Sequence, residues 1–418
     1  MAAPTLFTSR LLLLMVTVAF ALPGAGAAQL DPQQLLALRA LGLAAHRAGD
    51  PCNDDAAGAP VAASCDSGKP FRRVTSLTLT NCSDTTSVSP AALDALAPSL
   101  RALAFTDCPA VPPRLLPPEQ LAAGLLAFSC KSSLARLPLV WLSRLASLTE
   151  LAITDTPLAT GSSTSELAVL ISHMSNLTTL TLSHANISGA LPHHWHCANL
   201  ARLDLSGNRF TGAIPDAVTL LGGITSLNLS SNALNGSIPA RIGDLISLAA
   251  LDLSNNSLSG GIPDTLSTLP ELQVLNLGSN RLNGSIPRFL SGMKGLKEIN
   301  LEGNNLDGVV PFGAGFLAKL RVFRAAGNSK LCYNTSVLTA AVAVGVAPCD
   351  KYGFPVTPPP ATAQSEKSTD YDDGGGESDG NGEDSRGGPS AAVLGLAIGL
   401  SCLAFAVILV VCLCKVCR

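Results

Sequence analysis

The sequence predicts an α/β solenoid, in which about ten to eleven short coils stack into one curved parallel sheet, together with a single transmembrane helix. Two observations carry the prediction: the pattern Leu-x-x-Leu-x-Leu recurs about every 24 residues, and a charge-free apolar stretch lies near the end of the chain. The composition agrees, because 4% aromatic residues beside 37 Gly and 28 Pro indicate a chain that turns often.

The repeat gives each coil an expected shape. We expect the spaced leucines to point inward from a short strand and a turn, and the following Asn to bond backbone groups of the neighbouring coil. Eleven parallel strands about 4.8 Å apart would form a concave surface about 50 Å long, which suits a peptide or a protein face. The repeats begin at Val74, Leu100, Leu125, Leu148, Leu177, Leu200, Ile224, Leu248, Leu272, Leu296 and Leu320. The Asn positions are Asn208, Asn232, Asn256, Asn280 and Asn304.

The N-terminus has the layout of a secretory signal. Arg10 precedes an apolar run that ends before Pro23, and small residues follow at Ala25 to Ala28. We therefore predict a signal peptide over residues 1–28 and an oxidising compartment for the mature chain. The alternative is an uncleaved anchor helix, for which this run is short.

The other end of the chain predicts a membrane anchor. Residues 390–414 carry no charge and are long enough to cross a hydrocarbon core of about 30 Å. Lys415 and Arg418 follow, so the positive-inside rule predicts a type I orientation with residues 415–418 in the cytoplasm. This tail is too short for a kinase domain. A lipid-anchor signal is the alternative, although basic residues after the apolar run are atypical of it.

A second motif gives the repeats a family. Leu-x-Gly-x-Ile-Pro, or a close variant, follows the Asn at 210–215, 234–239, 258–263 and 282–287, which resembles the plant-specific class of leucine-rich repeats. The resemblance covers roughly Asp31 to Asp350 and implies a second short strand in each coil. Before Leu177 the pattern departs from the family: Cys82 and Cys108 replace the Asn, and Cys130 takes an inward Leu position.

The same resemblance implies a cap at each end of the repeats. The N-terminal cap (29–73) would hold a Cys52–Cys65 disulfide and a helix over 32–46, and the C-terminal cap (332–354), after repeats over 74–331, a Cys332–Cys349 disulfide. The residues expected on the buried face of the helix are Leu35, Leu36, Leu38 and Leu41. Cys82 and Cys108 occupy equivalent positions of adjacent coils, and both a disulfide and two free buried thiols fit them.

Sequons fit a secreted, glycosylated domain. They begin at Asn81, Asn176, Asn186, Asn228, Asn235, Asn255, Asn283 and Asn334. Residues 355–389 then change to a Pro-rich and acidic composition that predicts a disordered spacer, either a plain stalk or a negative patch for a basic partner segment. Its acids are Asp370, Asp372, Asp373, Glu377, Asp379, Glu383 and Asp384. In the transmembrane helix, Ala391, Gly395 and Gly399 predict a face of small residues for a partner helix.

The whole layout resembles the short-tailed, kinase-lacking receptor-like proteins of plants. In that family an acidic juxtamembrane stretch and a Gly-x-x-x-Gly helix pair with a leucine-rich-repeat adaptor receptor kinase in the same membrane. The resemblance implies a plasma-membrane receptor for an extracellular ligand, acting in defence or development. The segment Lys330 to Pro360 is similar to that of the small-ectodomain branch tied to innate immunity.

The candidate ligand surface is a polar stripe on the concave strands. Its residues are Arg202, Asp204, Asn228, Asp252, Asn276, Lys297, Glu298, Asn300 and Glu302. The family consensus explains the Asp and Asn residues without catalysis, and we predict neither an enzyme nor a cofactor. The three His residues and the Cys over 193–197 lack a metal-binding spacing. A net charge of −3 gives no basic footprint for nucleic acid.

Two other functions remain open at this stage. Polygalacturonase-inhibiting proteins share the repeat type, so a membrane-tethered inhibitor of microbial wall-degrading enzymes is one alternative, although those proteins lack a membrane helix. A co-receptor scaffold without a ligand of its own is the other.

Overall fold

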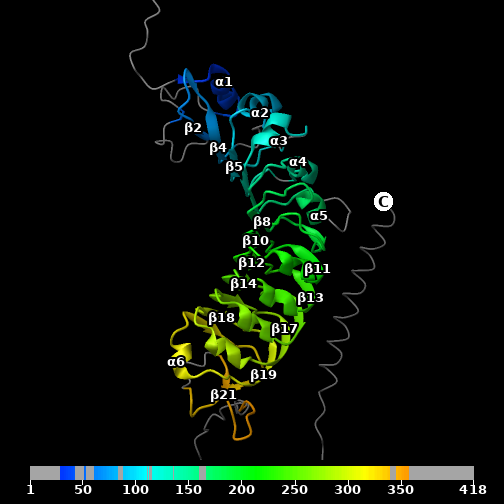
Figure 1. Cartoon of the computed structure of the whole chain (residues 1–418), viewed down its shortest axis with the longest axis vertical. Helices are drawn as coiled ribbons and strands as arrows, with labels where there is room; N and C mark the ends of the chain where they lie inside the picture. Colours follow the sequence, from blue (N-terminus) through cyan, green and yellow to red (C-terminus); the bar gives the residue numbers. More distant parts are fainter. Residues whose placement is uncertain are drawn as a thin grey trace, which may run out of the picture. The chain divides into compact units, whose positions relative to one another are not determined.

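The computed structural model describes residues 29–42, 51–52, 61–82, 88–110, 112, 115–134, 136–159, 166–338 and 345–356. These residues all fall within one compact unit. Its coils follow one another in sequence order along a curved stack (Figure 1).

The first sheet has twelve strands, in the order β2, β4, β5, β6, β7, β8, β10, β12, β14, β16, β18, β20. β2 pairs antiparallel with β4, and each later strand pairs in parallel with the one before it. This confirms the predicted solenoid of about ten to eleven coils, with eleven parallel strands observed in the described residues. The strands are β2 (Val61–Cys65), β4 (Val74–Thr80), β5 (Ala102–Thr106), β6 (Ala127–Lys131), β7 (Glu150–Thr154), β8 (Thr179–Ser183), β10 (Arg202–Asp204), β12 (Ser226–Asn228), β14 (Ala250–Asp252), β16 (Val274–Asn276), β18 (Glu298–Asn300) and β20 (Val322–Arg324).

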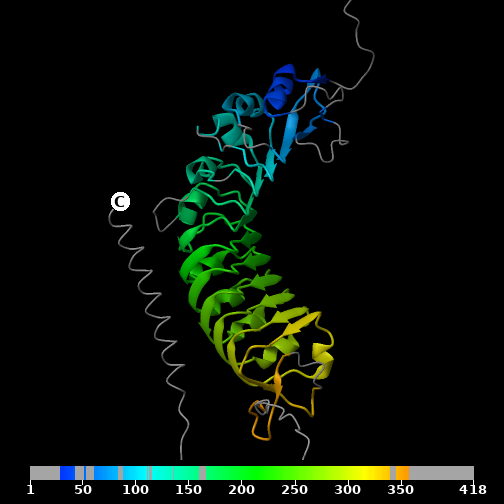
Figure 2. The same cartoon turned by 180° about the vertical axis from the view of Figure 1, so that it is seen from behind.

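A second parallel sheet of eight strands runs beside the first one in the later coils, as the family resemblance implies (Figure 2). The Leu-x-Gly-x-Ile-Pro segments supply most of it. Its strands are β9 (Ser188–Ala190), β11 (Arg209–Ala213), β13 (Ala233–Ser237), β15 (Ser257–Gly260), β17 (Arg281–Ser285), β19 (Asn305–Val309), β21 (Lys330–Tyr333) and β22 (Ala347–Pro348). A separate two-stranded sheet pairs β1 (Gln29–Leu30) with β3 (Phe71–Arg72).

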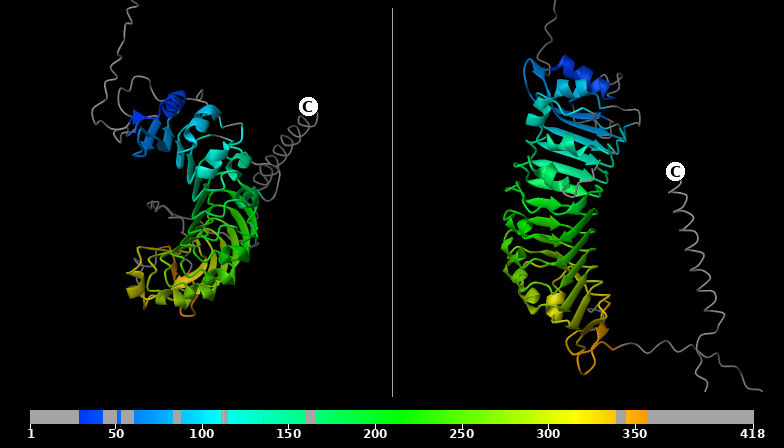
Figure 3. Two further views of the ribbon diagram at one scale, coloured as in Figure 1. Left: turned by 45° about the horizontal axis from the view of Figure 1, so that its top comes forward. Right: turned by 90° about the vertical axis from the view of Figure 1, so that its right-hand side faces the viewer.

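Helical segments lie on the outer side of most coils, and the successive coils stack regularly (Figure 3). The coil that begins at Leu177 has no helix in the described residues between β9 and β10. The early coils use α-helices: α2 (Pro90–Leu96), α3 (Glu119–Gly124), α4 (Leu139–Ser143) and α5 (Glu166–Ile171). The later coils use 3-10 helices: η2 (Asp216–Leu220), η3 (Ala240–Asp244), η4 (Asp264–Thr268) and η5 (Arg288–Gly292), before a short α6 (Ala314–Leu317). A Pro precedes each of these 3-10 helices, and its fixed φ suits the start of a short helix.

Stacked leucines form the core between the sheets and the outer helices. Leu203, Leu227 and Leu251 pair across neighbouring strands, and each is at most 1% exposed. Burying one such side chain contributes about 1.5–3 kcal/mol. No coil can bury its leucines alone, so the core exists only in the stack.

The Asn residues bond the neighbouring coil, as the sequence predicts. In Asn256, Nδ2 donates to Leu229 O of the preceding coil at 3.0 Å, and Oδ1 accepts from Leu234 N at 3.0 Å. The row also includes Asn328, beyond the five predicted members, where Nδ2 donates to Leu301 O at 2.9 Å. These amides satisfy backbone groups that the tight turns would otherwise leave unpaired.

Other groups fill this row in the early coils. Cys82 and Cys108 form a disulfide with Cα atoms 4.4 Å apart, which decides between the two predicted alternatives. Further along, Ser133 Oγ accepts from Cys108 N at 2.9 Å, and Thr156 Oγ1 accepts from Ser133 N at 3.2 Å. A covalent bond and hydroxyl groups thus replace the Asn amides.

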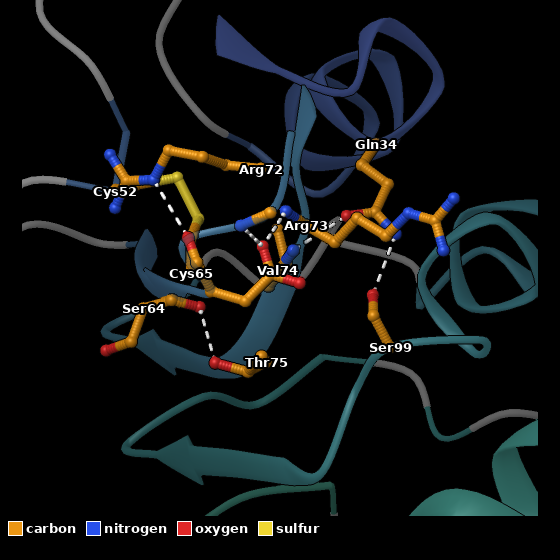
Figure 4. Close-up of a disulfide and its surroundings, with 11 residues drawn as sticks. Gln34, Cys52, Ser64, Cys65, Arg72, Arg73, Val74, Thr75 and Ser99 are labelled. Carbon is orange, nitrogen blue, oxygen red and sulfur yellow. Dashed lines mark hydrogen bonds between the residues drawn. A yellow bond between two sulfur atoms is a disulfide. The ribbon is translucent and has the colours of Figure 1, made fainter. Parts of the chain in front are cut away.

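The cap helix α1 (Pro32–Ala40) is shorter than the predicted helix over 32–46, and residues 43–50 lie outside the described part. The prediction that Leu36 is buried is wrong, because this side chain is 63% exposed. Gln34 is buried instead: Oε1 accepts from Val74 N at 2.7 Å and Nε2 donates to Ser99 Oγ at 2.9 Å (Figure 4). The helix therefore turns a polar residue inward to bond the edge of the first coil.

The disulfides of both caps are those that the family resemblance implies. Cys52 bonds Cys65, the last residue of β2 (Figure 4), and Cys332 of β21 bonds Cys349. Each cross-link lies at an end of the repeats, where a coil has a neighbour on one side alone. It helps to hold the cap over the exposed edge of the core.

Candidate ligand-binding surface

A ladder of polar side chains crosses the first sheet in the later coils. Asp204, Asn228, Asp252, Asn276 and Asn300 occupy the same register position in five neighbouring strands, so the structure brings these predicted residues together. They are half-buried and alternate with fully buried Leu or Ile. Arg324 of β20 continues the row beyond Asn300, a residue that the sequence reasoning missed.

Part of each ladder side chain is used to end its own strand. Oδ1 of Asp204 accepts from Ser206 N at 2.9 Å, and Oδ1 of Asn228 accepts from Ser230 N at 3.1 Å. In the other three ladder residues, Oδ1 also accepts from the backbone N–H of the residue two positions later. Asp and Asn suit this local turn, which explains their recurrence without reference to a ligand.

Two neighbouring side chains of the ladder are also hydrogen-bonded to each other. Asn276 Nδ2 donates to Asp252 Oδ2 at 2.8 Å and to Ser254 Oγ at 3.2 Å. Within the described residues, the second side-chain atoms of Asp204, Asn228 and Asn300 have no such bond. These three side chains therefore keep a free acceptor or donor group for another molecule.

The other predicted stripe residues divide into two groups. Arg202 and Glu298 share a second row, because their strands pair at that position through Ser226, Ala250 and Val274. Glu302 follows β18 and donates its N–H to Asn300 Oδ1 at 3.1 Å. Lys297 lies apart from the strand face: it precedes β18, and its Nζ donates to Gln273 Oε1 at 2.6 Å.

The early half of the first sheet differs from the later half. Apart from Lys131 and Glu150, the half-buried outward positions of β4 to β8 hold Ala, Ser or Thr. The outward face is therefore formed mostly by small uncharged residues toward the N-terminal cap and is more polar toward the C-terminal cap. A comparison of outward positions between repeats would have found this division in the sequence.

The comparisons with known proteins identify the family. The leucine rich repeat family model matches residues 198–258 and 246–306. Receptor-like protein 55 of Arabidopsis thaliana is 49% identical over 408 residues, which covers 93% of this chain and 93% of that protein. The chain belongs to the plant leucine-rich-repeat receptor-like proteins.

Solved structures resemble parts of this receptor-like protein. The plant peptide hormone receptor RGFR1 in complex with RGF2 is 22% identical, with a TM-score of 0.48 over 61% of this chain and 40% of that one. A plant ice-binding protein is 22% identical, with a TM-score of 0.46 over 73% of this chain and 96% of that one.

A Ser, a His and an Asp meet beside β8 in this receptor-like protein. Ser183 Oγ is 3.0 Å from His184 Nδ1, and Asp155 Oδ1 is 3.6 Å from the same nitrogen. A hydrolytic triad needs the hydroxyl and the carboxylate on opposite nitrogens of the imidazole ring. Since both contact Nδ1, the group is not arranged as a triad.

The His-rich segment lies on the outer side, before the coil that begins at Leu200. His193, His194 and His196 are exposed, whereas Cys197 is buried, and burial raises the pKa of its thiol to about 11. A metal ligand must be deprotonated, which this thiol resists. Within the described ranges, no group of three His, Cys, Asp or Glu residues is placed to hold a metal ion.

Several predictions concern residues outside the described ranges. They are the signal peptide (1–28), the acids between Asp370 and Asp384, the helix residues Ala391, Gly395 and Gly399, and the tail (415–418). In the part of the chain that the structure describes, none of the helices has the length and apolar character needed to cross a membrane.

Proposed function

We propose that this receptor-like protein is a single-pass type I protein of the plasma membrane. It binds an extracellular peptide, protein or glycan through the polar ladder and signals through a leucine-rich-repeat adaptor receptor kinase. Its membership of the family supports the receptor role, and the ladder with its free polar atoms is the observation that supports this binding surface. Catalysis is not part of the proposal, because half-buried carboxylates on a regular sheet, open to solvent on one side, lack the environment of a general acid.

The ladder has the size of an extended ligand segment. Four strand spacings of about 4.8 Å separate Asp204 from Asn300, which gives about 19 Å, the length of about six residues of extended chain. The free acceptor of Asp204 and the free donors of Asn228 and Asn300 would pair with backbone groups of such a segment. If Asn228 carries a glycan, as its sequon allows, the sugar would block ligand access to the ladder.

The partner kinase is proposed from the sequence beyond the described residues. The small residues Ala391, Gly395 and Gly399 would let a second helix approach closely, and the acidic spacer would select a basic partner segment. The similarity to the immunity branch favours defence, with development as the other role.

Recovery of partners from plant cells tests the binding surface. Full-length protein is purified before and after treatment with an elicitor mixture, and co-purifying proteins are identified by mass spectrometry. In one variant, Asp204→Asn and Asp252→Asn remove two ladder charges but retain the oxygen that ends each strand. We expect this variant to lose elicitor-dependent recovery of a receptor kinase.

A matched variant controls for the loss of charge. Asp216→Asn and Asp264→Asn remove two exposed carboxylates from the outer side and should leave recovery unchanged. Equal recovery with both variants would contradict the ladder as the binding surface. Recovery of secreted wall-degrading enzymes alone, without a kinase, would favour a membrane-tethered inhibitor.

A second pair of variants tests the route to the kinase. Gly395→Leu with Gly399→Leu should reduce kinase recovery, and so should replacement of the spacer acids by Asn. Unchanged recovery after both changes would rule out this route.

A further inference from the structure

A hollow of about 480 Å³ lies on the flank of the last coils, outside the polar ladder. Residues of three successive coils line it, just before β16, before β18 and in α6 with the turn that follows. Its apolar lining includes Leu296, Met293 and Phe316, and the ring of Phe316 packs 5.0 Å from that of Phe312. The core thus supports an apolar floor that remains open to solvent.

Four cations surround this floor, and we call them the basic flank: Lys294, Lys297, Lys319 and Arg321. The three lysines line the hollow together with one carboxylate, that of Glu271, so positive charge is in excess there. Arg321 lies beside Lys297, to whose carbonyl its N–H donates at 2.7 Å. All four side chains are exposed. The salt bridges within the described residues join other pairs, so none of the four is neutralised by an ion pair there.

The basic flank is local to these coils. Each of the four cations lies one or two residues before, or one residue after, the first Leu of its repeat. In the three preceding coils, the equivalent positions hold no cation. They are Gly222, Gly223, Thr225, Ile246, Ser247, Ala249, Pro270, Glu271 and Gln273. Since the same fold is built there without Lys or Arg, the solenoid itself does not require these charges.

The sequons of the later coils leave this flank uncovered. Asn235 and Asn283 lie in the second sheet, Asn228 lies on the ladder, Asn255 lies in the turn after β14, and Asn334 follows β21. Glycans at these positions would start from other faces of the coils. The flank therefore combines open access, an apolar floor and an excess of positive charge.

We propose that the hollow and the basic flank bind an acidic segment of a partner protein, which inserts one apolar side chain between its carboxylates. Ammonium and guanidinium groups without an ion-pair partner in the described residues, around an apolar floor, match both parts of such a segment. An acidic polysaccharide would satisfy the charges but offers no apolar side chain for Met293 and Phe316. This second surface adds to the proposed function and does not depend on the ladder.

A short peptide tests the proposal on the full-length protein in lipid nanodiscs. The probe is the blocked pentapeptide acetyl-Asp-Glu-Phe-Glu-Asp-amide, and binding is measured by isothermal titration calorimetry. The variant Lys294→Gln, Lys297→Gln and Lys319→Gln should weaken binding about tenfold, and added salt should weaken binding to the unsubstituted chain. No binding of the probe up to millimolar concentration would overturn the proposal.

Two controls separate the site from general charge attraction. Arg209→Gln, Arg281→Gln and Lys330→Gln remove three exposed cations from the second sheet and should leave binding unchanged. A probe with Gly in place of Phe should bind several-fold more weakly, because the apolar floor loses its contact. Equal losses in both triple variants would refute a specific site, and equal binding of both probes would refute the apolar contact.

Discussion

The Asn row makes a stability prediction that the structure allows us to work out. Asn280 is 9% exposed, and its Nδ2 donates to Leu253 O at 2.9 Å and to Leu277 O and Gly278 O at 3.2 Å. Its Oδ1 accepts from Leu258 N at 3.0 Å. In Asn280→Ala all four bonds are lost, and the turns of two coils lose a shared partner.

The expected cost follows from the groups left behind. A buried backbone group without a partner costs about 1–3 kcal/mol, and water entering the small cavity would satisfy some of these groups. We expect Asn280→Ala to lower the free energy of unfolding by about 2–5 kcal/mol. Urea unfolding of the purified chain, followed by far-ultraviolet circular dichroism, measures this difference.

The next coil offers a matched control. Asn305 is exposed and its side chain makes no hydrogen bond within the described residues, so Asn305→Ala should change the free energy by less than about 0.5 kcal/mol. Asn280→Asp keeps the acceptor for Leu258 N but places a carboxylate oxygen against three carbonyl oxygens, so it should cost at least as much as Asn280→Ala. If Asn280→Ala costs no more than Asn305→Ala, the amide row does not hold the coils together.

Three further predictions concern packing and cysteine chemistry. A Cβ on Gly243 would meet Thr265 O of the next coil, so Gly243→Ala should cost about 1–3 kcal/mol in urea unfolding, whereas Gly222→Ala, in open space, should be neutral. Replacing Cys82 and Cys108, 26 residues apart, by Ser should cost about 3.5 kcal/mol, and a stability equal to that of the parent chain would refute the cross-link. Burial raises the pKa of the Cys130 thiol from its ordinary value of 9.0 to about 11. The folded state therefore holds this proton more tightly, and the stability contributed by the neutral thiol should decline between about pH 9 and pH 11. Peptide mapping should show alkylation of Cys130 in urea but little in the folded chain at pH 8.

The disulfide network shows where sequence patterns alone leave a choice. The Cys52–Cys65 and Cys332–Cys349 pairs follow from the resemblance of the caps to a known family. Cys82 and Cys108 have no such guide, because a buried row position accepts either a thiol or a cross-link. The Cα separation of 4.4 Å in the structure decides this case.

The cap helix shows a different limit. The apolar residues of 32–46 predict a buried face, but Leu36 points to solvent and Gln34 points inward. The reason lies outside the helix, since Val74 N and Ser99 Oγ, distant in sequence, provide the bonds that stabilise a buried amide. Periodicity describes the helix but carries no information about the partners of one polar residue.

For the candidate surfaces, too, the sequence predicts one part and the tertiary structure decides another. The sequence alone locates the ladder, because the spacing of Asp204, Asn228 and Asp252 repeats the period of the coils and places them in one row. Which polar atoms stay free is decided by bonds between strands, such as that from Asn276 to Asp252. Lys297, predicted on the same stripe, belongs instead to the flank.

The sequence by itself determined the number of coils, the inward leucines and the Asn row of this receptor-like protein. These features repeat with a local period, and a period is readable along the chain. The tertiary structure alone decided the Cys82–Cys108 cross-link, the inward Gln34 and the hollow that three coils share. Each of these depends on distances between residues far apart in sequence, and stacking fixes those distances only after the coils have folded together.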